Sequence, residues 1–177
     1  YVIADVRQFK GLELKPEHGR EITRVSSMIR EAAIEQLPVA HPDYPGVGIT
    51  ISQLSGPTDD PAADWKNAVT MASGAFSWDN PATWTGAIDR CPCGTGTCAK
   101  MAVLHARGEL DLNRPFRHQS ILGNIYTGHL VEELEFHGKK AVVPTITGTS
   151  WIYALNTLLL DPDDPFTEGF TVGDTWA

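Results

Sequence analysis

Apolar residues recur at spacings that predict strands and one helix in the first half of the chain. Residues 1–6, YVIADV, are rich in β-branched side chains and indicate a strand. Residues 21–37 place apolar side chains on one helical face and predict a helix that Pro38 ends. Residues 47–52 alternate between apolar and polar or small side chains, as in a half-buried strand, and residues 67–72 indicate a further strand.

A long loop and a second helix are predicted next. Residues 73–86 carry several large aromatic side chains and predict a loop or hairpin of a length that usually has a function or marks an insertion. Small apolar residues then recur at helical spacing up to Gly108, where a helix stop is expected. Their size implies that this helix packs closely on a sheet. They are Ala99, Ala102, Val103 and Ala106.

The remaining sequence is rich in strand-forming residues and is broken at glycines. Three segments predict strands, and Trp151 and Tyr153 alternate within the last of them: residues 116–123, 125–136 and 140–160. Residues 161–177 are punctuated by Pro and Gly and are expected to be irregular. The pattern predicts an α+β fold with a curved, mainly antiparallel sheet around one central helix and a second helix outside.

Size and charge narrow the function classes. The 177 residues fit one ordinary domain that spans the whole chain. A net charge of -8 argues against a nucleic-acid partner, because phosphate backbones are bound by clustered Lys and Arg. Basic and acidic residues are interleaved in the first predicted helix, so we expect a solvated helix face formed by Arg20, Glu21, Arg24, Arg30, Glu31 and Glu35.

The chain is expected to be soluble and cytoplasmic, with no membrane partner. No apolar run approaches the roughly 20 residues that a membrane-spanning helix needs. Three cysteines bunched within one loop do not form the spread, even-numbered framework of a secreted disulfide protein, which favours a reducing compartment. Because Tyr1 already lies inside a predicted strand, we expect the chain to be a fragment of a longer protein.

Residues 89–110, DRCPCGTGTCAKMAVLHARGEL, carry the candidate chemistry. A metal site would use the three thiols Cys91, Cys93 and Cys98 with His105 or His118, but C-x-C and C-x4-C are not zinc-knuckle spacings. A redox pair would need C-x-x-C, which is absent from the sequence. Free cysteines also serve as small packing residues. A single reactive thiol is the fourth alternative.

The surroundings of Cys93 favour that fourth alternative. Cys93 follows a proline and precedes Gly-Thr-Gly-Thr at the start of the second predicted helix. The positive end of a helix dipole is expected to favour thiolate over thiol at this position. The backbone N–H groups of Gly94, Thr95 and Gly96 can hold a carboxylate, and Asp89 is a candidate anchor for an ammonium group. Together these residues indicate an amino-acid site.

The segment DRCPCGTGTCAKMA resembles the second-cysteine motif of the proline racemase family, which usually reads Asp-Arg-Ser-Pro-Cys-Gly-Thr-Gly-Thr-Ser-Ala. The resemblance continues through HQSILG and DPFTEGF and covers most of the chain, but only as the carboxy-terminal half of a family member. It implies one half of a diaminopimelate-epimerase-like fold. It also implies racemisation or epimerisation at Cα of proline or hydroxyproline by two cysteines, with no pyridoxal phosphate and no metal.

Carried over by residue, the resemblance implies that Cys93 is the second catalytic thiol. It implies that the amides of Gly94 and Thr95 bind the substrate carboxylate and that Asp89 contacts the imino nitrogen. A cysteine at position 93 favours inversion over the reaction of the trans-3-hydroxyproline dehydratase members, which typically have threonine there. A dehydratase-like relative and a non-catalytic imino-acid-binding relative are the alternatives.

The sequence departs from the family pattern in two ways. The motif of the first catalytic thiol, Met-Cys-Gly-His-Gly-like, is absent, so we expect the isolated chain to be inactive and to need a missing amino-terminal half. The tail from about residue 161 is expected to pack on that half, and a homodimer is a further alternative for the assembly. Cys91 and Cys98 replace serines of the motif and are expected to pack or to accept weak hydrogen bonds.

The other candidate residues are interpreted as structural. His105 is expected to be a scaffold histidine with satisfied hydrogen bonds, since unpaired buried polar groups are rare. His118, His129 and His137 lie in predicted strands or turns and are expected at the surface or a sheet edge. Trp84 is as consistent with a core or lid aromatic as with a substrate contact.

Overall fold

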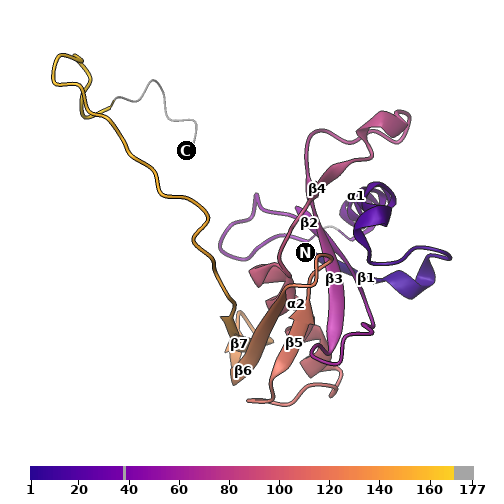
Figure 1. Cartoon of the computed structure of the whole chain (residues 1–177). Coiled ribbons are helices and arrows are strands. Elements are labelled where there is room, and N and C mark those ends of the chain that lie inside the picture. The colour runs from indigo at the N-terminus through magenta and orange to yellow at the C-terminus, as the bar shows by residue number, and fades with distance from the viewer. Residues whose placement is uncertain (38, 170–177) are drawn as a thin grey trace.

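The computed structural model describes residues 1–37 and 39–169 and shows one mixed sheet with two α-helices (Figure 1). The helices are α1 (Gly19–Gln36) and α2 (Gly94–Ala106). The strands are β1 (Val2–Asp5), β2 (Ile51–Gly56), β3 (Trp65–Ala72), β4 (Gly86–Ile88), β5 (Phe116–Gln119), β6 (Ile125–Phe136) and β7 (Lys139–Thr147). Short 3-10 turns are found at Val6–Gln8, Pro16–His18 and Pro81–Thr83.

The seven strands form one continuous sheet in the order β1-β2-β3-β5-β6-β7, with β4 paired to β3. The β1–β2 and β3–β5 pairings are parallel, and the other four are antiparallel. The β6–β7 register shifts between Leu130 and Glu132, a bulge of the kind that bends a strand and increases its twist. The sheet is therefore curved and mainly antiparallel, as the sequence predicts.

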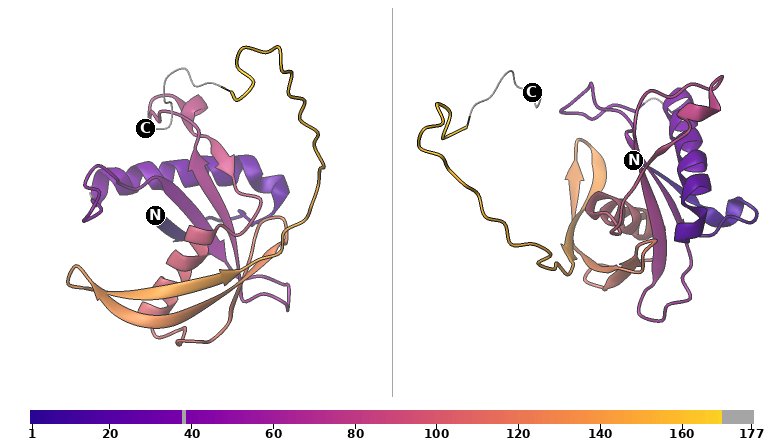
Figure 2. Two further views of the ribbon diagram at one scale, coloured as in Figure 1. Left: turned by 90° about the vertical axis from the view of Figure 1, so that its left-hand side faces the viewer. Right: turned by 45° about the horizontal axis from the view of Figure 1, so that its top comes forward.

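Helix α1 covers the outer face of β1 to β4 (Figure 2). Ile22 is completely buried on that helix and packs with Leu54 and Ala68 of the sheet. Part of the apolar face that the sequence predicts for residues 21–37 packs here, namely Ile22 with the partly buried Val25 and Ile29, whereas Leu37 is 64% exposed. The buried residues of this cluster are Val6, Leu14, Ile22, Leu54, Ala68 and Ile121.

Helix α2 lies inside the curve of the sheet, against β6 and β7 (Figure 2). Met101 and Leu104 of the helix pack with Phe116 and Leu130 of the strands. A side chain at Gly128 would collide with the Met101 sulfur, so glycine there lets the strand approach the helix closely. Helix α2 is therefore the central helix that the sequence predicts, and α1 is the outer one.

Most predicted element boundaries agree with the structure to within a few residues. The first helix was predicted for residues 21–37 and is observed at Gly19–Gln36, while Pro38 lies outside the described residues. Gly108 ends the second helix with a φ of 73°. The prediction of a strand from residue 47 is wrong, because β2 begins only at Ile51, where pairing with β3 starts.

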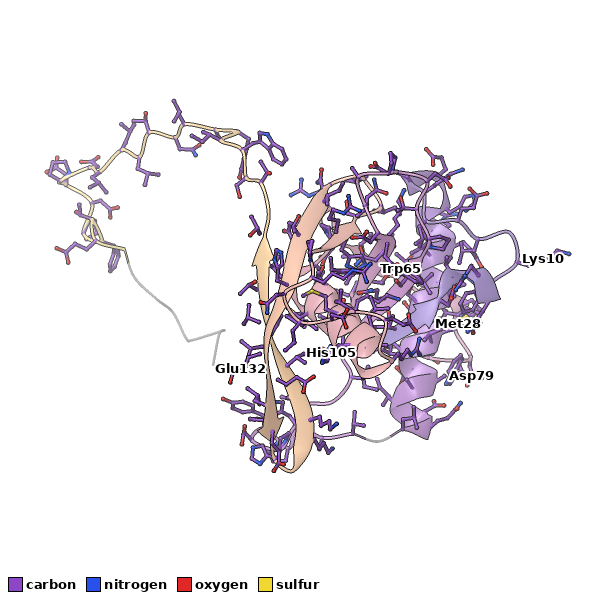
Figure 3. The ribbon with its side chains drawn as sticks, turned by 90° about the horizontal axis from the view of Figure 1, so that it is seen from below. Lys10, Met28, Trp65, Asp79, His105 and Glu132 are labelled. Atoms are coloured by element: carbon purple, nitrogen blue, oxygen red, sulfur yellow. The ribbon has the colours of Figure 1, made fainter. Side chains whose placement is uncertain are left out.

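The prediction of strand structure through residues 148–160 is also wrong. Strand β7 ends at Thr147, and the following residues to Leu160 form neither helix nor strand. Their side chains extend from the body on an isolated segment (Figure 3), and Trp151 and Tyr153 are 70% and 98% exposed. A β-prone sequence forms a strand only beside another strand, and within the described residues none pairs with this segment. Residues 161–169 are irregular as predicted, and residues 170–177 lie outside the described residues.

Two further expectations concern a membrane-spanning helix and the exposed face of α1. In the described residues, no helix has both the length and the apolar composition required to cross a membrane. The solvated face expected for α1 holds for Arg20, Glu21, Arg24 and Glu35, whereas Glu31 is half-buried and Arg30 is only 6% exposed. The Arg30 side chain is buried, and its guanidinium lies 3.6 Å from the Glu31 carboxylate.

Candidate functional site

The loop from β4 to α2 is held by hydrogen bonds to β3 and to α2 itself. The Asp89 N–H donates to the Val69 carbonyl at 3.0 Å, continuing the β3–β4 pairing. The buried Asn67 side chain donates its amide hydrogen to the Pro92 carbonyl at 2.8 Å. Thr97, also buried, donates its hydroxyl to the same carbonyl at 3.3 Å. A loop anchored in this way holds its side chains in one place.

Cys93 is the N-cap residue of α2, and its backbone is unusual. Its φ of 62° lies in the region that favours glycine, a conformation that costs on the order of 1–3 kcal/mol for other residues. The Gly96 N–H donates to the Cys93 Sγ at 3.4 Å, and the Thr97 N–H donates to the Cys93 carbonyl at 2.9 Å. The sulfur thus takes the place of the oxygen acceptor that usually caps a helix.

Gly94 and Thr95 form the exposed first turn of α2. The N–H groups at a helix start have no partner within the helix, and only the Gly96 N–H is directed to the Cys93 sulfur. A side chain at Gly94 would meet open space, so the approach to these amides is free. Two N–H donors at the positive end of a helix dipole suit a carboxylate ligand.

Asp89 lies beside Cys93, close enough for its carboxylate to interact with the thiol. The structure therefore brings together all four residues that the sequence predicts: Asp89, Cys93, Gly94 and Thr95. A carboxylate beside the thiol and two exposed amides in the next two residues are groups that can bind a zwitterionic amino acid through both of its charges.

One neighbour of the site has no signal in the sequence: Tyr1, the first residue of the chain. The Tyr1 hydroxyl lies 3.8 Å from the Cys93 Sγ and 3.3 Å from Gln53 Oε1. A Cβ at Gly96 would overlap the Tyr1 hydroxyl and lie 2.6 Å from Gln53 Oε1. Because Tyr1 and Cys93 are 92 positions apart, no sequence spacing signals this contact.

The expectation that the helix dipole favours the Cys93 thiolate is wrong for the structure as it stands. Burial raises the pKa of the Cys93 thiol, and the negative charge of Asp89 raises it further. The hydrogen bonds from Gly96 and Tyr1 lower the pKa but do not outweigh burial. Cys93 is therefore mainly a thiol at neutral pH, and its thiolate is a stronger base than that of an exposed cysteine.

The two other cysteines are half-buried near the same loop. The Cys91 thiol shares a hydrogen bond with the Tyr126 hydroxyl, and this contact raises the pKa of Tyr126 to about 12. Burial raises the pKa of Cys98, which lies close enough to Cys93 to be affected by its charge. In the residues that the structure describes, no three or more His, Cys, Asp or Glu side chains form a group suited to a metal ion.

The prediction that His118 lies at the surface or an edge is wrong. His118 is fully buried on β5, and its Nδ1 is 3.0 Å from the Thr97 hydroxyl of α2. Burial lowers the pKa of His118 to about 3, helped by the positive charge of Lys100, so the ring is neutral. Through its contact with Thr97, the His118 imidazole links β5 to the first turn of α2. β5 is central rather than an edge, which the local sequence pattern does not show.

The remaining predicted side chains have structural surroundings. His105 interacts with the Leu110 carbonyl at 2.7 Å and the Glu133 carboxylate at 2.6 Å, which confirms a scaffold histidine. His129 is half-buried on β6, and His137 is exposed at the β6–β7 turn. The Trp84 indole donates to the Ser77 carbonyl at 2.8 Å and stacks on Phe76. Trp84 is therefore a packing residue of the 73–86 loop.

Comparison with known proteins shows which family the chain belongs to. Residues 1–171 match the family model described as proline racemase. The chain is 34% identical over 161 residues to a proline racemase of Clostridioides difficile, covering 90% of this chain and 44% of that protein. It is 32% identical over 177 residues to a 4-hydroxyproline 2-epimerase of Allorhizobium ampelinum, covering 100% of this chain and 47% of that protein.

Solved structures show the same fold. A hydroxyproline epimerase from Agrobacterium vitis, with bound trans-4-hydroxy-L-proline, superposes with a TM-score of 0.72 at 32% identity, over 98% of this chain and 46% of that one. A probable proline racemase from Agrobacterium radiobacter K84, with bound carbonate, gives the same TM-score and identity over 98% and 47%. The fold is the α+β, diaminopimelate-epimerase-like class. The chain belongs to the proline racemase family and spans less than half the length of these relatives.

Proposed function

We propose that this chain supplies one half of a site that racemises or epimerises proline or hydroxyproline at Cα, without a cofactor or a metal. One arrangement carries the proposal: the Cys93 sulfur, the free amides of Gly94 and Thr95, and the Asp89 carboxylate converge at the start of α2. Family membership and the substrate-bound hydroxyproline epimerase support the substrate class.

Cys93 exchanges the proton at Cα in this proposal. As a thiolate it takes the proton, which leaves the electron pair on Cα, and a second thiol on the opposite face returns a proton to that carbon. In the reverse direction Cys93 is the donor, and a thiol with a raised pKa is in the right form for that step. Because a Cα proton is very weakly acidic, a desolvated and therefore stronger base helps to remove it.

Substrate binding uses the groups beside the thiol. The amides of Gly94 and Thr95 hold the carboxylate and stabilise the negative charge that spreads onto it as the Cα proton leaves. Asp89 contacts the positively charged imino nitrogen. Both contacts fix the ring so that one face of Cα is presented to Cys93.

The second thiol is assigned to an amino-terminal half that lies outside this sequence. The exposed apolar side chains after β7 support this assignment, because a chain rarely leaves so many of them in water. They are Trp151, Ile152, Tyr153, Leu155, Leu158, Leu159 and Leu160. We propose that they and the following tail pack on the missing half. The 177-residue chain is then expected to exchange no Cα hydrogen of proline or hydroxyproline in D2O, and exchange at a catalytic rate would contradict a two-thiol site.

The Cys93 assignment is tested in the whole protein that contains this chain. Cys93→Ser should lower inversion of L- and D-proline and of trans-4-hydroxy-L-proline by at least about 100-fold, because general acid–base catalysis contributes about that much or more. Chiral chromatography of the products measures it. Cys98→Ser, the same change at a half-buried cysteine of α2, should retain activity within a few-fold. Survival of inversion in Cys93→Ser would show that the assignment is wrong.

A non-catalytic binding protein is distinguished by a second measurement. Pyrrole-2-carboxylate, a planar mimic of the deprotonated substrate, should protect Cys93 of the whole protein from iodoacetamide. Protection without inversion would indicate a binding protein, and release of water from trans-3-hydroxyproline would indicate a dehydratase. Inversion together with protection is the result that the proposal requires.

A further inference from the structure

Tyr1 occupies a position from which it can act on the sulfur of the site. Strand β1 runs parallel to β2 with Val2 opposite Ser52, so Tyr1 precedes the paired residues and reaches over Gln53 toward the start of α2. Its hydroxyl is 3.8 Å from the Cys93 Sγ, within the range of a hydrogen bond to sulfur. The proton exchange proposed for Cys93 does not use this hydroxyl.

Two donors converge on one sulfur. The Gly96 N–H donates to Cys93 Sγ from within α2, and the Tyr1 O–H approaches the same atom from β1. A thiol needs an acceptor for its own proton, whereas a thiolate is stabilised by every donor around it. This arrangement therefore stabilises the Cys93 thiolate, the form that must exist before the sulfur takes the Cα proton.

The Tyr1 hydroxyl has one proton and two acceptors within reach. Besides the sulfur, it can donate to Gln53 Oε1 at 3.3 Å. Burial, together with the charges of Cys93 and Asp89, raises the pKa of Tyr1, so the hydroxyl keeps its proton and remains a donor. When Cys93 is a thiol, the Tyr1 hydroxyl can donate its hydrogen bond to Gln53 Oε1. When Cys93 is a thiolate, the negative charge attracts the same hydrogen bond to the sulfur.

The packing around the hydroxyl is consistent with a required position. Gln53 is only 1% exposed, and its Nε2 has no hydrogen-bond partner among the described residues. Burying this unpaired group costs free energy, while the Oε1 of the same amide accepts from the Tyr1 hydroxyl. Gly96 leaves room for the hydroxyl, since any Cβ there would overlap it. Residues from β1, β2 and α2 thus converge on one contact.

We propose that Tyr1 is a positioning residue for Cys93: its hydroxyl moves its hydrogen bond from Gln53 to the Cys93 sulfur when the thiolate forms. This inference relies on the proposed function only for the identity of the reacting thiol. It concerns the charge state of Cys93, which can be measured in the chain itself without any inversion activity. Its failure and the failure of the proposed function are therefore separate results.

The test measures the thiolate of Cys93 directly. In the 177-residue chain, C91S and C98S leave Cys93 as the remaining thiol, and the rate of iodoacetamide alkylation against pH gives its titration midpoint. Tyr1→Phe removes the hydroxyl and keeps the ring. We expect a higher midpoint and alkylation at pH 7.5 slowed by about three- to tenfold, the effect of losing one hydrogen bond of ordinary strength.

A second variant separates this effect from damage to the fold. Gln53→Met keeps the approximate volume and removes the competing acceptor, so the hydroxyl can donate only to sulfur, and the midpoint should move down. Tyr44→Phe, at an exposed tyrosine in the loop before β2, is the matched control and should leave the midpoint in place. The proposal is overturned if Tyr1→Phe leaves the midpoint unchanged, or if Tyr1→Phe and Gln53→Met move it in the same direction.

Discussion

The two helices pack on opposite faces of one sheet, and each face has a hydrophobic cluster with buried polar residues beside it. Under α1 the cluster is aliphatic, with Ile22 and Leu54 both fully buried, and the buried polar residues of the helix itself are Thr23, Ser26, Ser27 and Arg30. Under the first turns of α2 the sheet presents the buried polar residues Gln53, Asn67 and His118. Lys100 of α2 is also buried and lies 3.6 Å from the centre of the Trp65 ring, a cation–π contact.

The comparison shows that different parts of one sheet contribute to stability and to the position of the Cys93 sulfur. Apolar burial is not directional, so the aliphatic cluster under α1 stabilises the sheet without fixing the position of the Cys93 sulfur. Hydrogen bonds are directional, and those under α2 fix the Pro92 carbonyl and the first helical turn, which in turn fix the Cys93 sulfur. Replacing residues of the cluster under α1 should therefore affect stability alone. Replacing the hydrogen-bonding residues under α2 should affect both stability and the reactivity of the Cys93 thiol.

The largest stability effect is expected on the outer face. Ile22→Ala removes three carbon atoms at a completely buried position and should lower the free energy of unfolding by about 2–5 kcal/mol. Urea denaturation followed by circular dichroism measures it. The alkylation midpoint of Cys93 in the folded variant should stay at the wild-type value, and a shift of that midpoint would mean that the two faces are not separate.

A smaller stability effect with a larger effect on the site is expected on the inner face. Asn67→Ala removes the buried donor to the Pro92 carbonyl and should cost about 1–3 kcal/mol. Because that carbonyl belongs to the residue before Cys93, the alkylation rate of Cys93 should also change. Asn124→Ala is the matched control, since its exposed side chain donates to the Arg90 carbonyl of the same loop at 3.4 Å. Equal effects of the two variants would contradict a special role for the buried bond.

The pH dependence of stability tests the buried histidine of the inner face. The pKa of His118 is about 3 in the folded chain and about 6.5 in an unfolded chain, so the unfolded state takes up the proton first as the pH falls. This residue should reduce the free energy of unfolding by roughly 1 kcal/mol per pH unit between pH 6.5 and 3. His118→Asn should remove that part of the slope in urea titrations at several pH values. An unchanged slope would show that His118 is not held neutral.

Much of this domain could be predicted from local patterns in the sequence. The spacing of apolar residues predicted both helices, because a helix buries one face whatever it packs against. The motif at residues 89–95 predicted the four residues that converge at the start of α2, because loop and helix start are contiguous in the chain. The same local logic failed after Thr147, where β-prone residues have no neighbouring strand within the described residues.

The sequence alone determined the two helices, the curved α+β architecture and the positions of Asp89, Cys93, Gly94 and Thr95. Only the tertiary structure decided that His118 is buried, that burial raises the pKa of Cys93, and that Tyr1 reaches the sulfur. The physical reason is that helix formation and capping depend on neighbours in the chain. Desolvation and contacts between β1, β2 and α2 depend instead on residues that folding brings together from far apart.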